Sequence, residues 1–137
     1  MPYEEMLGSV PLFSRLEKED LERLGKAVVA RKYKKGAEIV KEGEQAVAFY
    51  VIVSGKVQVT KGGTELATKG AGEPFGEMAL LDGYPRSTSI VALEDTECLV
   101  MTRWDFTAEL RTNPSIALSM LPELSKIIRR LEGEEIP

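Results

Sequence analysis

The middle of the chain alternates short β-prone runs with glycine turns, and this pattern restricts the fold more than any other feature. Runs rich in β-branched and aromatic residues recur over residues 29–101, and turns such as Lys61-Gly62-Gly63 separate them. Many short strands with evenly spaced turns indicate an antiparallel sandwich or barrel. The sequence therefore predicts a mainly β protein with an antiparallel β-roll, jelly-roll-like or of the double-stranded β-helix type.

Helical periodicity flanks this β segment on both sides. Residues 1–28 are expected to form N-terminal helices, and residues 102–132 C-terminal helices. Thr102 is the expected N-cap of the first C-terminal helix, and Asn113-Pro114 that of the last one. Pro122 lies inside that last helix and is expected to kink or restart it. Residues 133–137 are expected to form an acidic tail, so a single domain spans residues 1–137.

Length and composition indicate a globular protein and argue against several function classes. The chain has 137 residues, of which 43% are hydrophobic and 29% charged, which is the mixture found in soluble domains. Its net charge of −4 argues against nucleic-acid binding, which needs a basic face. No apolar run is long enough to span a membrane, and the acidic start lacks the features of a signal peptide. We therefore expect a cytoplasmic protein with no membrane or nucleic-acid partner.

The chain contains no histidine, which excludes most familiar catalytic sites. Histidine-based metal sites, Ser-His-Asp triads and Cys-His pairs are ruled out. The single cysteine, Cys98, lies in an apolar alternation and is expected to be a small buried residue. We therefore expect no enzyme activity, no metal site and no cofactor.

The segment over residues 75–89 has the composition of a phosphate and sugar site. Gly76 permits a sharp turn, and the helix formers after it predict a helical turn whose first N–H groups favour an anion. Arg86 supplies a planar guanidinium that can hold two phosphate oxygens. Glu77 would repel a phosphate but can accept a hydrogen bond from a sugar hydroxyl. The residues expected to bind the ligand are Gly76, Glu77, Met78, Ala79, Arg86, Ser87 and Thr88.

This segment resembles the phosphate-binding cassette of cyclic nucleotide-binding domains, which reads Phe-Gly-Glu-x-Ala-Leu-Leu, a short loop, and then Pro-Arg with small residues. The turns at Gly36, Glu42-Gly43 and Ser54-Gly55 are similar to the glycine turns of the same family. The resemblance is closest to the effector domain of cyclic-AMP receptor/FNR-type regulators. It implies that Glu77 binds the ribose 2′-OH and that Arg86 binds the cyclic phosphate.

The resemblance does not determine which base the nucleotide carries or which residues cover that base. A hydroxyl after the arginine, as at Ser87, can favour cyclic GMP, yet bacterial cyclic-AMP receptors also carry serine there. Cyclic AMP is the expected ligand and cyclic GMP the alternative. Relatives cover the base with their last helix, but residues 129–132 show no clear match to those polar contacts. A helix-turn-helix follows this helix in the regulators, whereas this chain stops at Pro137, so no DNA binding is expected.

Two functions remain open from the sequence. The first is a regulatory sensor in which cyclic nucleotide binding moves the C-terminal helix and so signals to an unknown effector protein. The second is a protein-interaction module that keeps the fold and does not depend on the ligand. The wide apolar stripe of the last helix is either intramolecular core or partly a homodimer contact.

Overall fold

The computed structural model describes residues 3–134, and its internal contacts divide them into two compact units. Residues 28–106 form the first unit, and residues 3–27 together with 107–134 form the second. Each unit is described separately below. The expectation of a single domain over residues 1–137 stays a prediction.

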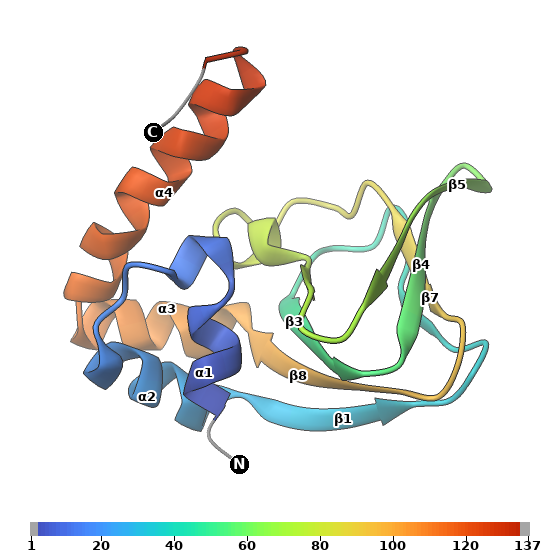
Figure 1. Cartoon of the computed structure of the whole chain (residues 1–137), viewed down its shortest axis with the longest axis horizontal. Coiled ribbons are helices and arrows are strands. Elements are labelled where there is room, and N and C mark those ends of the chain that lie inside the picture. Colours follow the sequence, from blue (N-terminus) through green and yellow to red (C-terminus); the bar gives the residue numbers. More distant parts are fainter. Residues whose placement is uncertain (1–2, 135–137) are drawn as a thin grey trace. The chain divides into compact units, whose positions relative to one another are not determined.

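The first unit consists of two antiparallel sheets with four strands each (Figure 1). In spatial order, the first sheet contains β1 (Val29–Tyr33), β8 (Thr96–Thr102), β3 (Ala48–Ser54) and β6 (Pro74–Phe75). The second sheet contains β2 (Glu38–Val40), β7 (Ser89–Ala92), β4 (Lys56–Lys61) and β5 (Thr64–Gly70). The predicted mainly β, antiparallel roll with flanking helices is thereby confirmed.

The core of the roll is formed by inward-facing side chains of both sheets. On β3, alternate residues face this core, as the period of two in a strand requires. Cys98 is completely buried among them, which confirms its predicted place in the core, and burial raises the pKa of its thiol to about 12. The core cluster comprises Val40, Ala48, Tyr50, Ile52, Val57, Phe75, Ile90, Cys98 and Val100.

Strand β6 was not predicted from the sequence. It has only two residues, Pro74 and Phe75, and pairs with Val51 and Tyr50 at the edge of the first sheet. Two residues show no periodicity, and proline is tolerated at an edge because it cannot donate a ladder hydrogen bond. The Phe75 and Tyr50 rings stack at a centroid distance of 4.7 Å. This stacking holds the chain immediately before Gly76.

The second unit is helical, as predicted for both ends of the chain. A buried carboxylate joins its parts: Asp20 accepts hydrogen bonds from Arg23 Nη1 at 2.7 Å and from Ser115 Oγ at 3.0 Å. Within residues 3–134, no helix combines the length and apolar character needed to cross a bilayer. The helices are α1 (Tyr3–Gly8), the 3-10 helix η1 (Pro11–Phe13), α2 (Lys18–Ala27) and α4 (Ser115–Leu131), and α3 (Arg103–Thr112) connects the two units.

Of the predicted features of the C-terminal helices, the Thr102 cap is confirmed, whereas the Asn113 cap and a restart at Pro122 are wrong. Thr102 Oγ1 accepts the Asp105 amide at 3.1 Å and caps α3, as expected. Asn113 does not cap α4 through its side chain, because its amide donates to Glu109 at 3.5 Å instead. Nor does α4 restart at Pro122, because it is continuous through this residue, and the alternative of a kink stays a prediction. The loss of one N–H at this position is not enough to end a helix that other residues hold in place. The expected acidic tail lies outside the described residues from position 135 on.

The apolar stripe of α4 is only partly buried. Ile116 and Met120 in its first half are buried. Four other large apolar side chains are more than half exposed, namely Leu118, Leu121, Ile128 and Leu131. The interpretation of the whole stripe as intramolecular core is therefore wrong for Leu121, Ile128 and Leu131, which belong to it.

The ion pair between Glu123 and Arg15 predicts a pH dependence of stability. Arg15 Nε donates to Glu123 Oε1 at 2.7 Å, and this bond, with help from Lys126, lowers the pKa of the Glu123 carboxyl below its ordinary value. A carboxylate with a lowered folded-state pKa stabilises the folded protein above its unfolded-state pKa, and the contribution is lost as the pH falls through the folded-state pKa. We expect the thermal midpoint of Glu123→Gln to lie below that of the unchanged protein at neutral pH, with the difference closing as the pH falls below the ordinary pKa of a glutamate carboxyl. Parallel midpoint curves for the two proteins would contradict this role.

Candidate functional site

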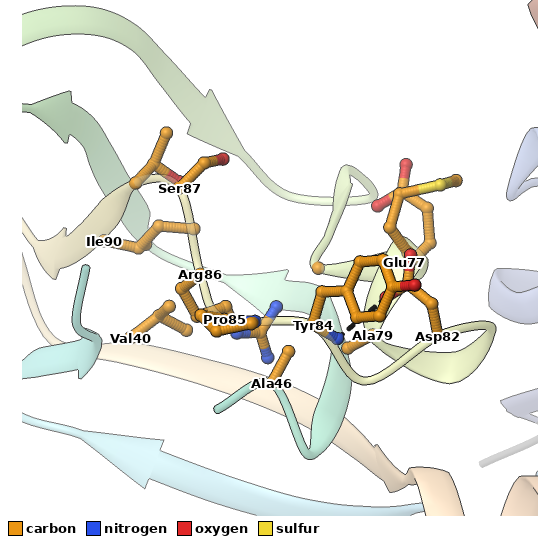
Figure 2. A pocket seen from close by; sticks show the side chains of 13 residues that line it. Val40, Ala46, Glu77, Ala79, Asp82, Tyr84, Pro85, Arg86, Ser87 and Ile90 are labelled. Atoms are coloured by element: carbon orange, nitrogen blue, oxygen red, sulfur yellow. Dashed lines mark hydrogen bonds between the residues drawn. The ribbon is translucent and has the colours of Figure 1, made fainter. Parts of the chain in front are cut away.

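The predicted ligand residues surround one cavity in the first unit. Its volume is about 350 Å³, within the roughly 300–1,000 Å³ of small-molecule sites. In Figure 2, Ser87 lies on the left of the view with Arg86 below it, and Glu77 lies on the right. Their function as ligand contacts stays a prediction at this point. The cavity is lined by all seven of the predicted residues, Gly76, Glu77, Met78, Ala79, Arg86, Ser87 and Thr88.

The start of the cassette is a left-handed glycine followed by a helical turn. Gly76 has a φ of 77° and a ψ of 19°, a conformation that side chains disfavour. The 3-10 helix η2 (Glu77–Leu80) begins directly after it, and Ala79 N donates to Gly76 O at 3.0 Å. The first amides of such a turn have no acceptor within the helix and can bind an anion. The predicted helical turn after Gly76 is therefore present.

Arg86 is the cation of the cavity, and its guanidinium is held in place by three neighbours. Its Nη2 donates to Ala48 O at 2.5 Å, and its Cζ lies 6.0 Å from the centre of the Tyr50 ring. The absence of a side chain at Gly76 leaves the space that Nη1 occupies, since a Cβ there would overlap this atom. Burial lowers the pKa of Arg86, and the nearby Tyr50 opposes this shift. An arginine remains charged under these conditions, so the cavity contains a fixed, partly desolvated positive charge.

The main chain of Arg86 is held by the loop between β2 and β3, a contact that sequence analysis did not predict. Gly43 N donates to Arg86 O at 2.9 Å, and Arg86 N donates to Glu44 O at 2.8 Å. Gln45 forms a β-bridge with Pro85. Positions 43–45 and 85–86 therefore form a short two-stranded contact that fixes where the arginine side chain begins.

The remaining predicted residues differ in their accessibility. Glu77 is half-buried in the first turn of η2, and Ala79 is buried beneath this turn. Ser87 is exposed at the cavity rim, whereas Thr88 is half-buried. Among the predicted residues, two hydroxyls and one carboxylate thus accompany the arginine, groups that can contact a ligand with hydroxyls and one negative charge.

Six further residues line the cavity and were missed. Asp82, Tyr84 and Pro85 belong to the loop inside the cassette, so their proximity to the site could have been inferred from its continuity. The others are apolar residues outside the cassette or at its end, and only the pairing of the strands brings them here. They are Val40, Ala46 and Ile90.

Known proteins resemble this chain in both sequence and structure. The sequence model of the cyclic nucleotide-binding domain family matches residues 30–113. The chain is 40% identical over 134 residues to the cyclic AMP receptor protein of Thermus thermophilus, covering 94% of this chain and 62% of that protein. It is 36% identical over 137 residues to the cAMP-dependent protein kinase regulatory subunit of Aspergillus niger, covering 98% of this chain and 31% of that subunit. The chain thus spans less than two thirds of the length of either relative.

Solved structures give the same family. The N-terminal domain of a transcriptional regulator from Streptomyces coelicolor superimposes with a TM-score of 0.87 at 25% identity, covering 96% of this chain and 98% of that one. The catabolite activator protein of Thermus thermophilus has a TM-score of 0.74 at 38% identity, covering 89% of this chain and 60% of that one. The family that these comparisons share is defined by binding, not by catalysis. The chain belongs to the cyclic nucleotide-binding domain family.

Proposed function

We propose that this chain binds a 3′,5′-cyclic nucleotide in the cassette cavity, with cyclic AMP preferred to cyclic GMP, and acts as a regulatory module. The observation that carries the proposal is the convergence of all seven cassette residues on one cavity around the fixed guanidinium of Arg86. A cyclic phosphate carries one negative charge, so one arginine together with the free amides of η2 is a matching site.

Each polar residue has a distinct role in this proposal. Arg86 binds the cyclic phosphate, and the first turn of η2 approaches the same group with its amides. Glu77 accepts a hydrogen bond from the ribose 2′-OH. A 2′-deoxy analogue cannot donate this bond and should therefore bind more weakly. Ser87 and Thr88 donate to the phosphate or to the edge of the base. The preference for cyclic AMP draws support from the relatives, whose names include a cyclic AMP receptor protein and a cAMP-dependent kinase subunit.

Calorimetric titration with cyclic AMP and cyclic GMP tests the proposal. We expect saturable binding of both nucleotides, with the higher affinity for cyclic AMP. Linear 5′-AMP, which lacks the cyclic phosphate, serves as the control ligand and is expected to bind much more weakly. No heat with either cyclic nucleotide, in protein shown to be folded by circular dichroism, would overturn the proposal.

The proposed output is a change in the C-terminal helix that an effector protein reads. A ligand can shift this helix only by binding more tightly to one of its two arrangements. The exposed apolar residues of α4 are consistent with a binding surface for another protein, and a second copy of this chain is one such partner. Hydrogen exchange of α4 with and without saturating cyclic AMP tests the shift, and identical exchange would count against it. Sedimentation of the same samples tests the homodimer.

The exposed α4 residues also favour one alternative, a protein-interaction module that does not depend on ligand. Leu121, Ile128 and Leu131 would dock a partner directly whether or not the cavity is filled. This alternative predicts that cyclic AMP leaves the thermal midpoint of the protein unchanged. The sensor proposal predicts a rise with ligand concentration, because a ligand that binds only the folded state stabilises it.

A further inference from the structure

Arg103, the first residue of α3, connects the cassette to the start of that helix. Its Nη1 donates to the carbonyl oxygen of Asp82, in the cassette loop, at 3.3 Å. Its backbone N–H donates to Val47 O at 2.9 Å, just before β3. All of these atoms lie within the unit formed by residues 28–106. One residue thus joins the cassette loop, the segment just before β3 and the start of α3.

Gly83 provides the space for this contact. It is buried and has a φ of 67°, and a Cβ at this position would overlap Arg103 Nη1. The same Cβ would lie 2.8 Å from Cζ and 3.2 Å from Nε, so the guanidinium packs along the main chain of Gly83. The contact between the two residues therefore depends on glycine at one position and on a flat cation at the other.

The loop held by Arg103 continues directly into the ligand-binding residues. Asp82 Oδ1 accepts the amide of Tyr84 at 2.9 Å, and both of these residues line the cavity. Pro85 and Arg86 follow at once. Arg103 itself does not appear among the residues that line the cavity. Any effect of Arg103 on the ligand must therefore act through the loop.

The stability of α3 does not explain an arginine at this position. The N-terminus of a helix carries a partial positive charge, which disfavours a cation in the first turn. Asp105, in the same turn, supplies the favourable charge and receives the Thr102 cap. A residue that conflicts with local helix electrostatics often has a role elsewhere, and here the contact with Asp82 and Gly83 is that role.

We infer that Arg103 is a positioning residue for the ligand: it holds the 82–84 loop in the conformation that presents Arg86, and it links occupancy of the cavity to the start of α3. The inference rests on the proposed binding of a cyclic nucleotide. Binding and the Arg103 contact stabilise the same loop conformation, so each strengthens the other by the same factor.

The test compares cyclic AMP affinity by calorimetry in Arg103→Met, in Arg103→Lys and in the control Arg111→Met at the other end of α3. Arg103→Met keeps the length of the side chain but removes every donor, and we expect affinity to fall about tenfold. Arg103→Lys should retain part of the affinity that Arg103→Met loses, because the lysine ammonium can donate to Asp82 O but cannot pack flat along the main chain of Gly83. Hydrogen exchange at the Tyr84 amide should accelerate in Arg103→Met and stay unchanged in the control.

A double-mutant cycle separates positioning from a general loss of stability. Gly83→Ala and Arg103→Met break the same contact, so their combined loss of affinity should be smaller than the sum of the single losses. Unchanged affinity in Arg103→Met, in protein that loses binding through Arg86→Ala, would overturn this inference and leave the proposed function standing. No binding by the unchanged protein would overturn both. If Arg103→Met does not fold, Arg103→Lys decides, and full affinity in that variant overturns the inference.

Discussion

Replacing Arg86 with alanine is expected to weaken cyclic AMP binding by more than about a hundredfold, because the change removes the charge-assisted contact to the phosphate that we propose for this residue. The half-buried guanidinium is the only cation among the described residues that line the cavity, so no other side chain there can replace it. Calorimetric titration of the variant beside the unchanged protein measures the loss.

The same substitution should affect folding far less than binding. Burial disfavours the charged form of Arg86, which offsets the hydrogen bond to Ala48 and the contact with Tyr50. The thermal midpoint without ligand is therefore expected to change little, while the rise in midpoint on adding cyclic AMP disappears. Arg86→Lys keeps the charge and loses the planar geometry, so its affinity should be intermediate. Wild-type affinity in Arg86→Ala would show that the phosphate lies elsewhere.

Replacing Gly76 with alanine is expected to abolish measurable ligand binding and to lower stability. The left-handed φ of 77° costs an alanine about 1–2 kcal/mol. In addition, the new Cβ would overlap Arg86 Nη1 and would lie 3.3 Å from Ala48 O, so the guanidinium must leave its position. Thermal unfolding measures the first effect, and cyclic AMP titration measures the second.

Gly72→Ala is the matched control for this variant. Gly72 has a φ of 84°, close to that of Gly76, but a Cβ there would meet nothing within 4 Å. Both variants should lose a similar amount of stability through backbone strain, whereas only Gly76→Ala should lose binding. Equal affinities in the two variants would show that the space at Gly76 is not needed to position Arg86.

Much of the fold could be predicted from the sequence because strand period and glycine turns are local signals. The apolar alternation around Cys98 predicted that this residue lies in the core, and the β-rich run at residues 48–53 predicted the strand that became β3. The two-residue strand β6 gave no such signal, and its position depends on the stacking of Phe75 on Tyr50. The caps of α4 could not be predicted either, since Asn113 has a competing acceptor in Glu109.

The candidate site was predictable where its residues are contiguous and not where the fold assembles it. The string from Gly76 to Thr88 contains all the polar groups that were predicted. The contact of Arg86 with Ala48, by contrast, joins positions 38 residues apart, and no spacing rule indicates it. The same applies to the support that Gly43 and Glu44 give to the main chain of Arg86.

That support has a consequence for how such a domain can evolve. The bonds with Gly43 and Glu44 involve only main-chain atoms of residue 86, so they can form with any residue there except proline. The main-chain atoms of residue 86 thereby hold the loop, whereas its side chain is the part that is proposed to contact the ligand. If Arg86 binds the ligand as proposed, a substitution at position 86 removes or changes ligand binding while the loop keeps its pairing with residues 43–45. Ligand specificity can therefore change through single substitutions while each intermediate protein keeps the fold of the roll.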